Sequence, residues 1–327
     1  MSLHVDLKIL VLNYLYLEDG IPLGYYNKLT EINSNDKSID LSLFSKSYKK
    51  LNLLNNVNLT DNSIKELPRN LTHLDLHINP NLTDECVKDL PINLTYFDLS
   101  CGKKLTDNCI KDLPRNLTHL IFMFNLNLTD NCIRDLPRNL IYFVLRYNTN
   151  LTNNCIKDLP RNLTNLDLSL NKNLTDECIK DLPRTLIHFH LNYNRNLTDD
   201  CVKDLPRTLT DLKLCYNTNL TDKCIKELPR NLTHLNLNNN ENLTDNCIID
   251  LPRTLTYLNL SLNKTLPDNC IKDLPRTLTD LKLCYNINLT DNCIKDLPKN
   301  LKHLDFMYNK KINKELIHKT LPKCKII

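Results

Sequence analysis

The sequence has very little glycine, no tryptophan and no long apolar segment, and each absence excludes a class of protein. Gly occurs 3 times in 327 residues and Trp does not occur. A glycine-rich phosphate loop is therefore excluded. No stretch reaches the roughly 18 apolar residues of a membrane-spanning helix. The first residues also lack the basic stretch and apolar run of a signal peptide. We therefore expect a cytoplasmic protein with no membrane partner.

A charge excess of one sign is also missing. The 42 basic and 38 acidic side chains leave a formal net charge of +4. This balance provides no general attraction to nucleic acid, so we expect no nucleic-acid partner. Hydrophobic residues make up 41% and charged residues 24% of the chain, which is typical of a soluble protein.

An internal repeat of 23 residues dominates the chain. Proline recurs at this step from Pro68 to Pro298, without insertion or deletion. Units that pack only on their neighbours form solenoids, so a long chain needs no single large core. A column of cysteines follows the same step: Cys86, Cys109, Cys132, Cys155, Cys178, Cys201, Cys224, Cys247, Cys270 and Cys293.

One half of each unit has the form LxxLxLxxN, as in Leu163, Leu166, Leu168 and Asn171. Apolar and polar residues alternate here, which predicts a strand whose leucines point into the core. The asparagine can satisfy backbone groups where the chain leaves the sheet. Gly102 interrupts the asparagine column, so we expect a local irregularity at that position.

The other half of the unit predicts a short helix. Thr83 or Asp84 can cap its first turn, and Cys86 and Leu90 would face the core. Pro91 ends the helix and forces the preceding residue toward an extended conformation. The helix is therefore expected to have only one or two turns.

Together the two halves resemble the leucine-rich-repeat family over residues 48–309. The resemblance implies an α/β solenoid, or horseshoe, with a concave parallel β-sheet and short convex helices. As a whole the chain is similar to repeat proteins of mimivirus-type giant DNA viruses, which would place it in the cytoplasm of a host cell. Residues 1–47 and 310–327 would then form N-terminal and C-terminal caps over the open ends.

Residues 3–15 and 43–51 also resemble the opening and the close of an F-box. The opening departs from that family at His4, where proline is usual, and the middle carries extra residues. This resemblance implies a second interpretation of the N-terminal module. The chain would be the substrate-recognition subunit of a cullin ubiquitin ligase, and residues 1–50 would bind the ligase adaptor. Both interpretations stay open at this point.

Three repeated features have a functional and a structural interpretation. The cysteine column could be a metal or redox ladder, but a uniform line of thiols is more typical of a small buried filler. Asn-x-Thr triplets such as the one at Asn81 match glycosylation acceptors, but they follow from the repeat. Arginines such as Arg115 could track phosphates. Acidic residues three positions earlier favour charge compensation on a solvated edge instead.

The positions that flank the inward strand residues vary within a fixed frame and are rich in Tyr and His. We predict that they bind an unidentified protein partner, because such residues combine contact area with a polar end. Residues 207–220 nearly repeat as residues 276–289, so binding determinants would recur. The predicted binding residues are His73, Asp75, His77, Tyr96, His119, Tyr142, Arg146, His188, His190, Asp211, Lys213, Tyr216, His234, Tyr257, Asp280, Lys282, Tyr285, His303 and Asp305.

Strand alternation would place His73, Asp75 and His77 on one face, and His188 and His190 repeat the spacing. Such a set could hold a transition metal, but interface polar groups are the commoner case. No nucleophile, base and acid occur in a catalytic arrangement. We therefore predict a non-enzyme with no cofactor and no metal.

Overall fold

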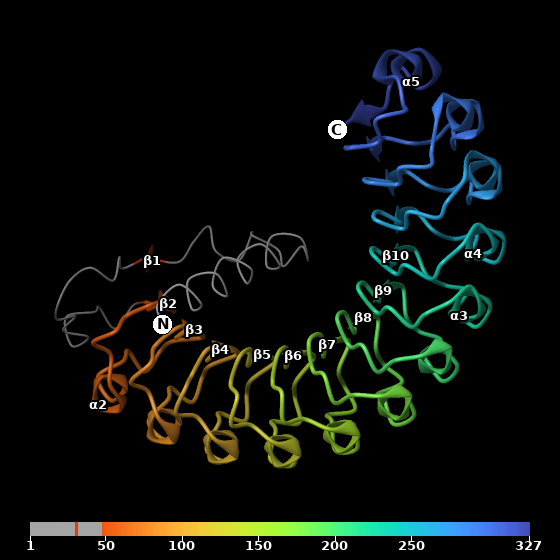
Figure 1. Cartoon of the computed structure of the whole chain (residues 1–327). Helices are drawn as coiled ribbons and strands as arrows, with labels where there is room; N and C mark the ends of the chain where they lie inside the picture. Colours follow the sequence, from red (N-terminus) through yellow and green to blue (C-terminus); the bar gives the residue numbers. More distant parts are fainter. Residues whose placement is uncertain (1–29, 32–47) are drawn as a thin grey trace, which may run out of the picture.

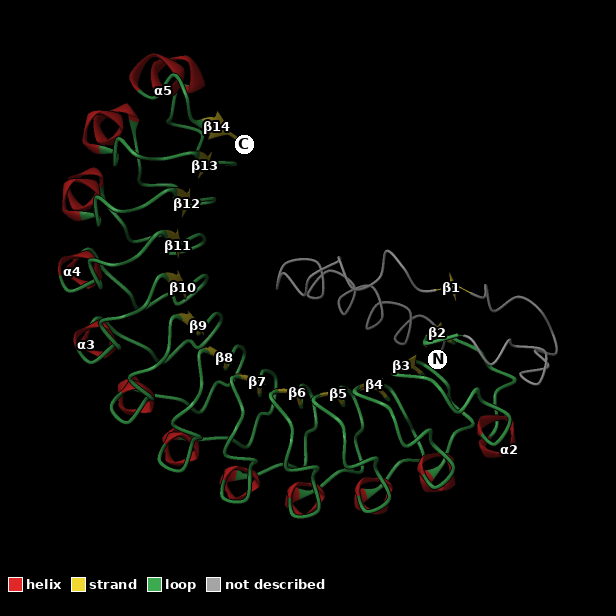
Figure 2. Cartoon of the chain, turned by 180° about the vertical axis from the view of Figure 1, so that it is seen from behind, coloured by secondary structure: helices red, strands yellow, loops and turns green. Residues whose placement is uncertain are grey.

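Each 23-residue unit forms one turn of a coil, with a three-residue strand on one side and a single helical turn on the other. The computed structural model describes residues 30–31 and 48–327, and it arranges these turns in an arc (Figure 1). Strands line the inner side of the arc and helices its outer side (Figure 2). The two sides are the concave and the convex face of the solenoid.

Over the described residues, one parallel sheet of 14 strands follows the chain order without a crossover. Equivalent residues of successive units are register partners, as in the row from His73 through Tyr96 to His119. The strands are β1 (Thr30–Glu31), β2 (Lys50–Asn52), β3 (His73–Asp75), β4 (Tyr96–Asp98), β5 (His119–Ile121), β6 (Tyr142–Val144), β7 (Asn165–Asp167), β8 (His188–His190), β9 (Asp211–Lys213), β10 (His234–Asn236), β11 (Tyr257–Asn259), β12 (Asp280–Lys282), β13 (His303–Asp305) and β14 (Lys325–Ile326).

Most convex turns are 3-10 rather than α-helical. The proline that closes each unit leaves too little chain for a longer helix. The 3-10 helices are η3 (Asp84–Val87), η4 (Asp107–Ile110), η5 (Asp130–Ile133), η6 (Asn153–Ile156), η7 (Asp176–Ile179), η8 (Asp199–Val202), η9 (Asp268–Asp273) and η10 (Asp291–Asp296). The α-helices are α2 (Asp61–Ile64), α3 (Lys223–Lys226), α4 (Asn246–Ile249) and α5 (Lys314–Thr320).

Leucines of the strands and residues of the convex turns fill one continuous core between the two faces. The cysteine column lies in this core, as expected, and its members are at most 3% exposed. All 14 cysteines, which lie within the described part of the chain, are free thiols. Burial raises the pKa of Cys178 to about 12, so this thiol is a poor nucleophile and a poor metal ligand at neutral pH.

The asparagine column forms a buried hydrogen-bond ladder, as the sequence predicts. The Asn171 amide nitrogen donates to the carbonyl oxygens of Leu145 and Leu168 at 2.8 and 3.0 Å. Its amide oxygen accepts the backbone N–H of Asn148 at 2.7 Å. The side chain is 0% exposed, so these bonds replace water for backbone groups at the end of the strand.

Gly102 interrupts this ladder on one side only. Its backbone N–H still donates to the Asn125 side-chain oxygen at 2.7 Å, as an asparagine would at this position. Without a side-chain amide, however, Gly102 cannot make the bonds that Asn171 makes to the preceding unit. A Cβ atom on Gly102 would lie 2.2 Å from Cδ1 of Leu105, so the leucine occupies the space of the missing side chain.

The Thr-Asp dipeptide at the start of each convex turn joins neighbouring units. The Thr198 hydroxyl accepts the N–H of Asp200 at 3.3 Å, which is the predicted helix cap. Thr198 also donates from its N–H and its hydroxyl to the Asp176 carboxylate at 2.8 and 2.6 Å. The Asn196 amide donates to the Lys172 carbonyl at 2.7 Å. The Asn-x-Thr triplet is thus an inter-unit contact.

The predicted charge compensation by the arginine column is wrong. Arg115 donates to the carbonyl oxygen of Lys111 in its own unit at 2.9 Å and to that of Asp135 in the next unit at 2.7 Å. The other arginines of the column make equivalent bonds, for example Arg253 to Asp273. The guanidinium groups therefore satisfy carbonyls at the ends of the convex turns, which a short helix leaves without partners.

Replacing Asn171 with leucine should lower the free energy of unfolding by about 2–5 kcal/mol. Each buried backbone group that loses its partner costs about 1–3 kcal/mol. Urea denaturation followed by circular dichroism would measure the loss. Asn173→Leu is the matched control, because exposed Asn173 makes one bond, to the Thr149 carbonyl, and should cost about 1 kcal/mol. Equal losses for both variants would contradict the role of the ladder.

Candidate binding surface on the concave face

Three columns of side chains lie on the concave side. We call them the first, third and fifth columns: the first and third residues of each strand, and the residue two positions after the strand. In β7 these are Asn165, Asp167 and Ser169. Parallel pairing in register places members of one column at about one strand spacing, ~4.8 Å, from each other. All three columns contain predicted binding residues.

The first column is an aromatic ladder at its N-terminal end. Ring centroids of His73 and Tyr96 are 5.7 Å apart, those of Tyr96 and His119 6.3 Å, and those of His119 and Tyr142 5.4 Å. Burial, and then the charge of Lys50, lowers the pKa of His73 to about 4. Burial also lowers the pKa of His119. Both rings are therefore neutral at pH 7 and stack as aromatic groups.

The third column changes from buried to exposed along the chain. From β2 to β7 its members are at most 5% exposed, and two of them are Asp75 and Asp98. From β8 onward most members are partly or fully exposed, as His190, Lys213 and Lys282 show. In the third column the accessible positions therefore lie between β8 and β13, whereas the first column is at least partly exposed along the whole arc. The repeat has the same pattern in every unit, so the sequence did not predict this change in exposure along the chain.

A small apolar cluster, separate from the main core, accounts for part of the buried stretch. Ile121, Met123 and Val144 are at most 3% exposed, and partly buried aromatic rings pack against them. The rings are Tyr96, Phe124 and Tyr142. The predicted binding residues Tyr96 and Tyr142 are thus committed to packing along part of their surface.

Arg146 belongs to a buried ion pair. Its side chain is 4% exposed and pairs with Asp167, whose side chain is 7% exposed. The Nε–Oδ2 distance is 3.1 Å, and His190 Nδ1 lies 3.5 Å from the same oxygen. Burial alone would raise the pKa of Asp167, but the Arg146 charge and His190 together hold it well below its usual range.

The paired histidines of β8 point to different partners. His188 Nδ1 lies 3.3 Å from an Asp211 oxygen, whereas His190 faces Asp167. The sequence alternative of a metal held jointly by both histidines is therefore not favoured. His303 Nδ1 lies 2.6 Å from an Asp280 oxygen, so Asp211 and Asp280, equivalent residues of the duplicated segments, each pair with a histidine of an adjacent strand.

Tyr216 and Tyr285 lie outside the three columns, in the turn just before the ladder asparagine. Each has a positive φ, 58° and 55°, as does the equivalent residue of every unit from Asn55 to Tyr308. The stacked rings of Tyr216 and Tyr193 have centroids 4.1 Å apart, and those of Tyr285 and Tyr308 have centroids 4.3 Å apart. A bulky residue in this conformation is uncommon. These tyrosines form a rim beside the concave face.

The remaining predicted residues lie in the first, third and fifth columns. In the first column, His234 is exposed and stacks with Tyr257, with the ring centroids 5.8 Å apart. Asp305 lies in the third column of β13. His77 is a fifth-column residue that is 9% exposed. Diagonal contacts join the fifth column of one unit to the third column of the next, as in Arg146 with Asp167. The repeat did not predict these contacts, although opposite charges 21 residues apart would have indicated this one.

The concave thiols are poorly suited to nucleophilic catalysis. Burial, and then a hydrogen bond with Asp305, raises the pKa of Cys284 to about 12. The Cys215 thiol donates to the Asn236 carbonyl at 3.7 Å. The cavity beside Cys215 has a volume of only about 40 Å³, far below the several hundred Å³ of a typical small-molecule site. The prediction of a non-enzyme stays a prediction.

No protein-family model and no curated protein sequence matches the chain. Solved structures do match. A chain of the Rad7 and Elc1 complex from yeast aligns with a TM-score of 0.62 and 20% identity, covering 86% of this chain and 81% of that one. The internalin InlF from Listeria monocytogenes aligns with a TM-score of 0.54 and 18% identity, covering 86% of each. At these identities the likeness concerns the fold alone.

The repeat, the parallel sheet and these likenesses together define the fold as a leucine-rich-repeat solenoid. The α/β horseshoe expected from the sequence is thereby confirmed, with mostly 3-10 helices on its convex side. Among the described residues, no helix is both long and apolar enough to cross a membrane. The proposed F-box segments fall almost entirely outside the described residues.

Replacing Asp167 with asparagine should lower the free energy of unfolding by about 3–5 kcal/mol at pH 7, because Arg146 keeps a buried charge without its counter-ion. The lowered pKa of Asp167 means that its contribution is present above about pH 4 and lost as the pH falls further. Urea denaturation between pH 3 and pH 7 would measure both effects.

The double variant Arg146→Met/Asp167→Asn is the matched control for this prediction. It removes both charges, keeps the acceptor for the Ser169 N–H and should recover most of the lost stability, since no buried charge is left without its counter-ion. A single variant as stable as the wild type at pH 7 would show that the pair contributes nothing.

Proposed function

We propose that the chain is a protein-binding module whose partner contacts the concave face between β8 and β13. The observation that carries this proposal is the change in exposure along the third column. Charged side chains of this column, such as Lys213 and Lys282, become accessible from β8 onward, while the frame that holds them stays constant. Regular strands position side chains precisely with little entropy to lose on binding, which favours recognition of an extended protein surface.

The duplicated segments support two equivalent contact points. Asp211 and Lys213 on β9 recur as Asp280 and Lys282 on β12. Three strand spacings separate them, about 14–15 Å. In both places an acid–histidine pair lies beside a lysine. A partner with alternating acidic and basic groups at this pitch would match the surface, and mixed charge favours specificity over general electrostatic attraction.

The fold also occurs in an assembly of two proteins, since the similar yeast structure is a complex of Rad7 and Elc1. This supports a protein as the partner of the chain. The small volume beside Cys215 is in agreement, because it cannot enclose a metabolite.

The double variant Lys213→Glu/Lys282→Glu should weaken partner binding at least about tenfold, since central charged contacts contribute about 1.4 kcal/mol or more. A photo-reactive residue at position 282 would first capture the partner from cell extract for identification. Calorimetry with the purified partner would then measure Kd.

Lys226→Glu/Lys272→Glu is the control for this experiment, because it makes the same charge change on the convex turns α3 and η9. It should leave Kd within about twofold, as expected for a charge outside the interface. Equal cross-linking from positions 272 and 282, or an unchanged Kd in the double variant, would overturn the concave-face proposal.

The F-box-like residues carry a second proposal, in which residues 1–50 bind a cullin-ligase adaptor and the repeats select the substrate. Ile9 lies at a position where that family places isoleucine. Ile9→Asp should abolish binding of the purified adaptor to the full-length chain in calorimetry, with circular dichroism as folding control. Lys213→Glu/Lys282→Glu should leave adaptor binding intact. No binding by the folded wild type would leave only the capping interpretation.

A further inference from the structure

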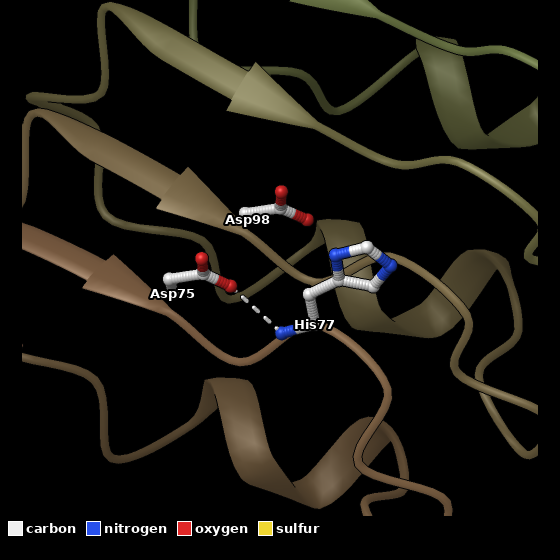
Figure 3. A group of neighbouring side chains, drawn as sticks. All are labelled: Asp75, His77 and Asp98. Carbon is white, nitrogen blue, oxygen red and sulfur yellow. Dashed lines mark hydrogen bonds between the residues drawn. The ribbon is translucent and has the colours of Figure 1, made fainter. Parts of the chain in front are cut away.

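Three potential metal ligands meet near the N-terminal end of the concave face. Asp75 and Asp98 are third-column residues of β3 and β4, and His77 follows β3 in the fifth column. One ligand atom of each lies within 4.8 Å of the others. Figure 3 shows the three side chains grouped on one side of the two strands. They are 4%, 0% and 9% exposed respectively.

Each carboxylate is held in place by one of its oxygens. Asp75 Oδ1 accepts the N–H of His77 at 2.9 Å, and Asp98 Oδ1 accepts the N–H of Ser100 at 2.9 Å. Because the strands pair in register at Asp75 and Asp98, the two carboxylates lie side by side. One oxygen of each carboxylate is thus fixed by the turn, and the ligand atoms of the two groups and of His77 lie within 4.8 Å of one another.

The equivalent slot between a fifth-column and a third-column residue, three units further along, shows what such a position accommodates. Arg146 and Asp167 are separated by 21 residues, as are His77 and Asp98, so His77 stands where Arg146 stands relative to its aspartate. Beside Asp167 the neighbouring third-column residue is Val144, whereas beside Asp98 it is Asp75. The slot at Asp167 therefore contains its own cation, Arg146. The slot at Asp98 contains a neutral ring nitrogen of His77 and a second carboxylate, that of Asp75.

We propose that Asp75, His77 and Asp98 form a binding site for a divalent transition-metal ion of the zinc type. Two carboxylate oxygens and one imidazole nitrogen are ligands that Zn²⁺ accepts at about 2.0–2.2 Å. Three protein ligands leave at least one coordination position for water. The bound ion takes the place of the Arg146 charge and joins β3 to β4. The sequence suggested His73, Asp75 and His77 as the alternative metal set, and in the structure Asp98 of the next strand stands in the place of His73.

The electrostatics of the slot agree with this assignment. Burial, and then the Asp98 charge, raises the pKa of Asp75 to about 7. Burial lowers the pKa of His77, so its imidazole is neutral and able to ligate at pH 7. A cation between the two carboxylates would remove their repulsion.

Full-length protein freed of metal with EDTA, titrated with ZnCl₂ in a calorimeter, should bind one equivalent that is lost when His77 is replaced. His77→Ala should raise Kd at least about tenfold. His303→Ala, which removes an exposed histidine that also faces an aspartate, is the matched control and should leave Kd unchanged. Binding that persists in His77→Ala would assign the zinc to other groups, such as the thiols, and overturn the site.

Asp75→Asn provides a second test that does not depend on His77→Ala folding well. Asparagine keeps the acceptor for the His77 N–H but removes one of the two charges. Without metal, this variant should melt at the same or a higher Tm than the wild type above pH 7, because the repulsion is gone. Zinc should raise the Tm of the wild type only. A zinc-dependent rise of equal size in Asp75→Asn, or none in either protein, would refute the proposal.

Discussion

Every unit of this solenoid depends on how it satisfies backbone groups at the places where strand and helical turn end. A strand of three residues and a turn of four leave many N–H and C=O groups without partners in the same element. The buried asparagine ladder supplies these partners on the concave side, and Thr, Asp and Arg supply them on the convex side. Apolar burial drives the stacking of the units, and these hydrogen bonds set its register.

This constraint explains why most of the repeat has no freedom to change. Leu, Cys and Asn face the interior, and Thr, Asp and Arg bridge to the neighbouring unit. Residue types in the concave columns and in the turn before the ladder asparagine differ from unit to unit, although some of these residues also hold the turn, as Asp98 does by accepting the Ser100 N–H. Much of the chemical difference between units therefore lies on one face. There they appear as stacked rings, a buried ion pair, acid–histidine pairs and a cluster of metal-ligating side chains.

The concave face consequently has two parts with different chemistry. Between β3 and β7 its third column is buried. Arg146 compensates the charge of Asp167 there, whereas Asp75 and Asp98 lie side by side. From β8 onward the same positions are accessible, and the duplicated segments present Asp and Lys at two places. The buried part can hold an ion or an internal ion pair, and the accessible part can contact a protein partner. Both proposals rest on this division, yet they involve different residues.

The sequence by itself determined the number and pitch of the units, the inward direction of the leucines and the burial of the cysteine column. Strict periodicity and strand alternation are local properties, so they can be read without coordinates. Only the tertiary structure decided that Arg146 meets Asp167, that His77 meets Asp98 and that Tyr216 lies on the rim. These contacts join neighbouring units diagonally, and they depend on the register and turn geometry between strands, which no single repeat contains.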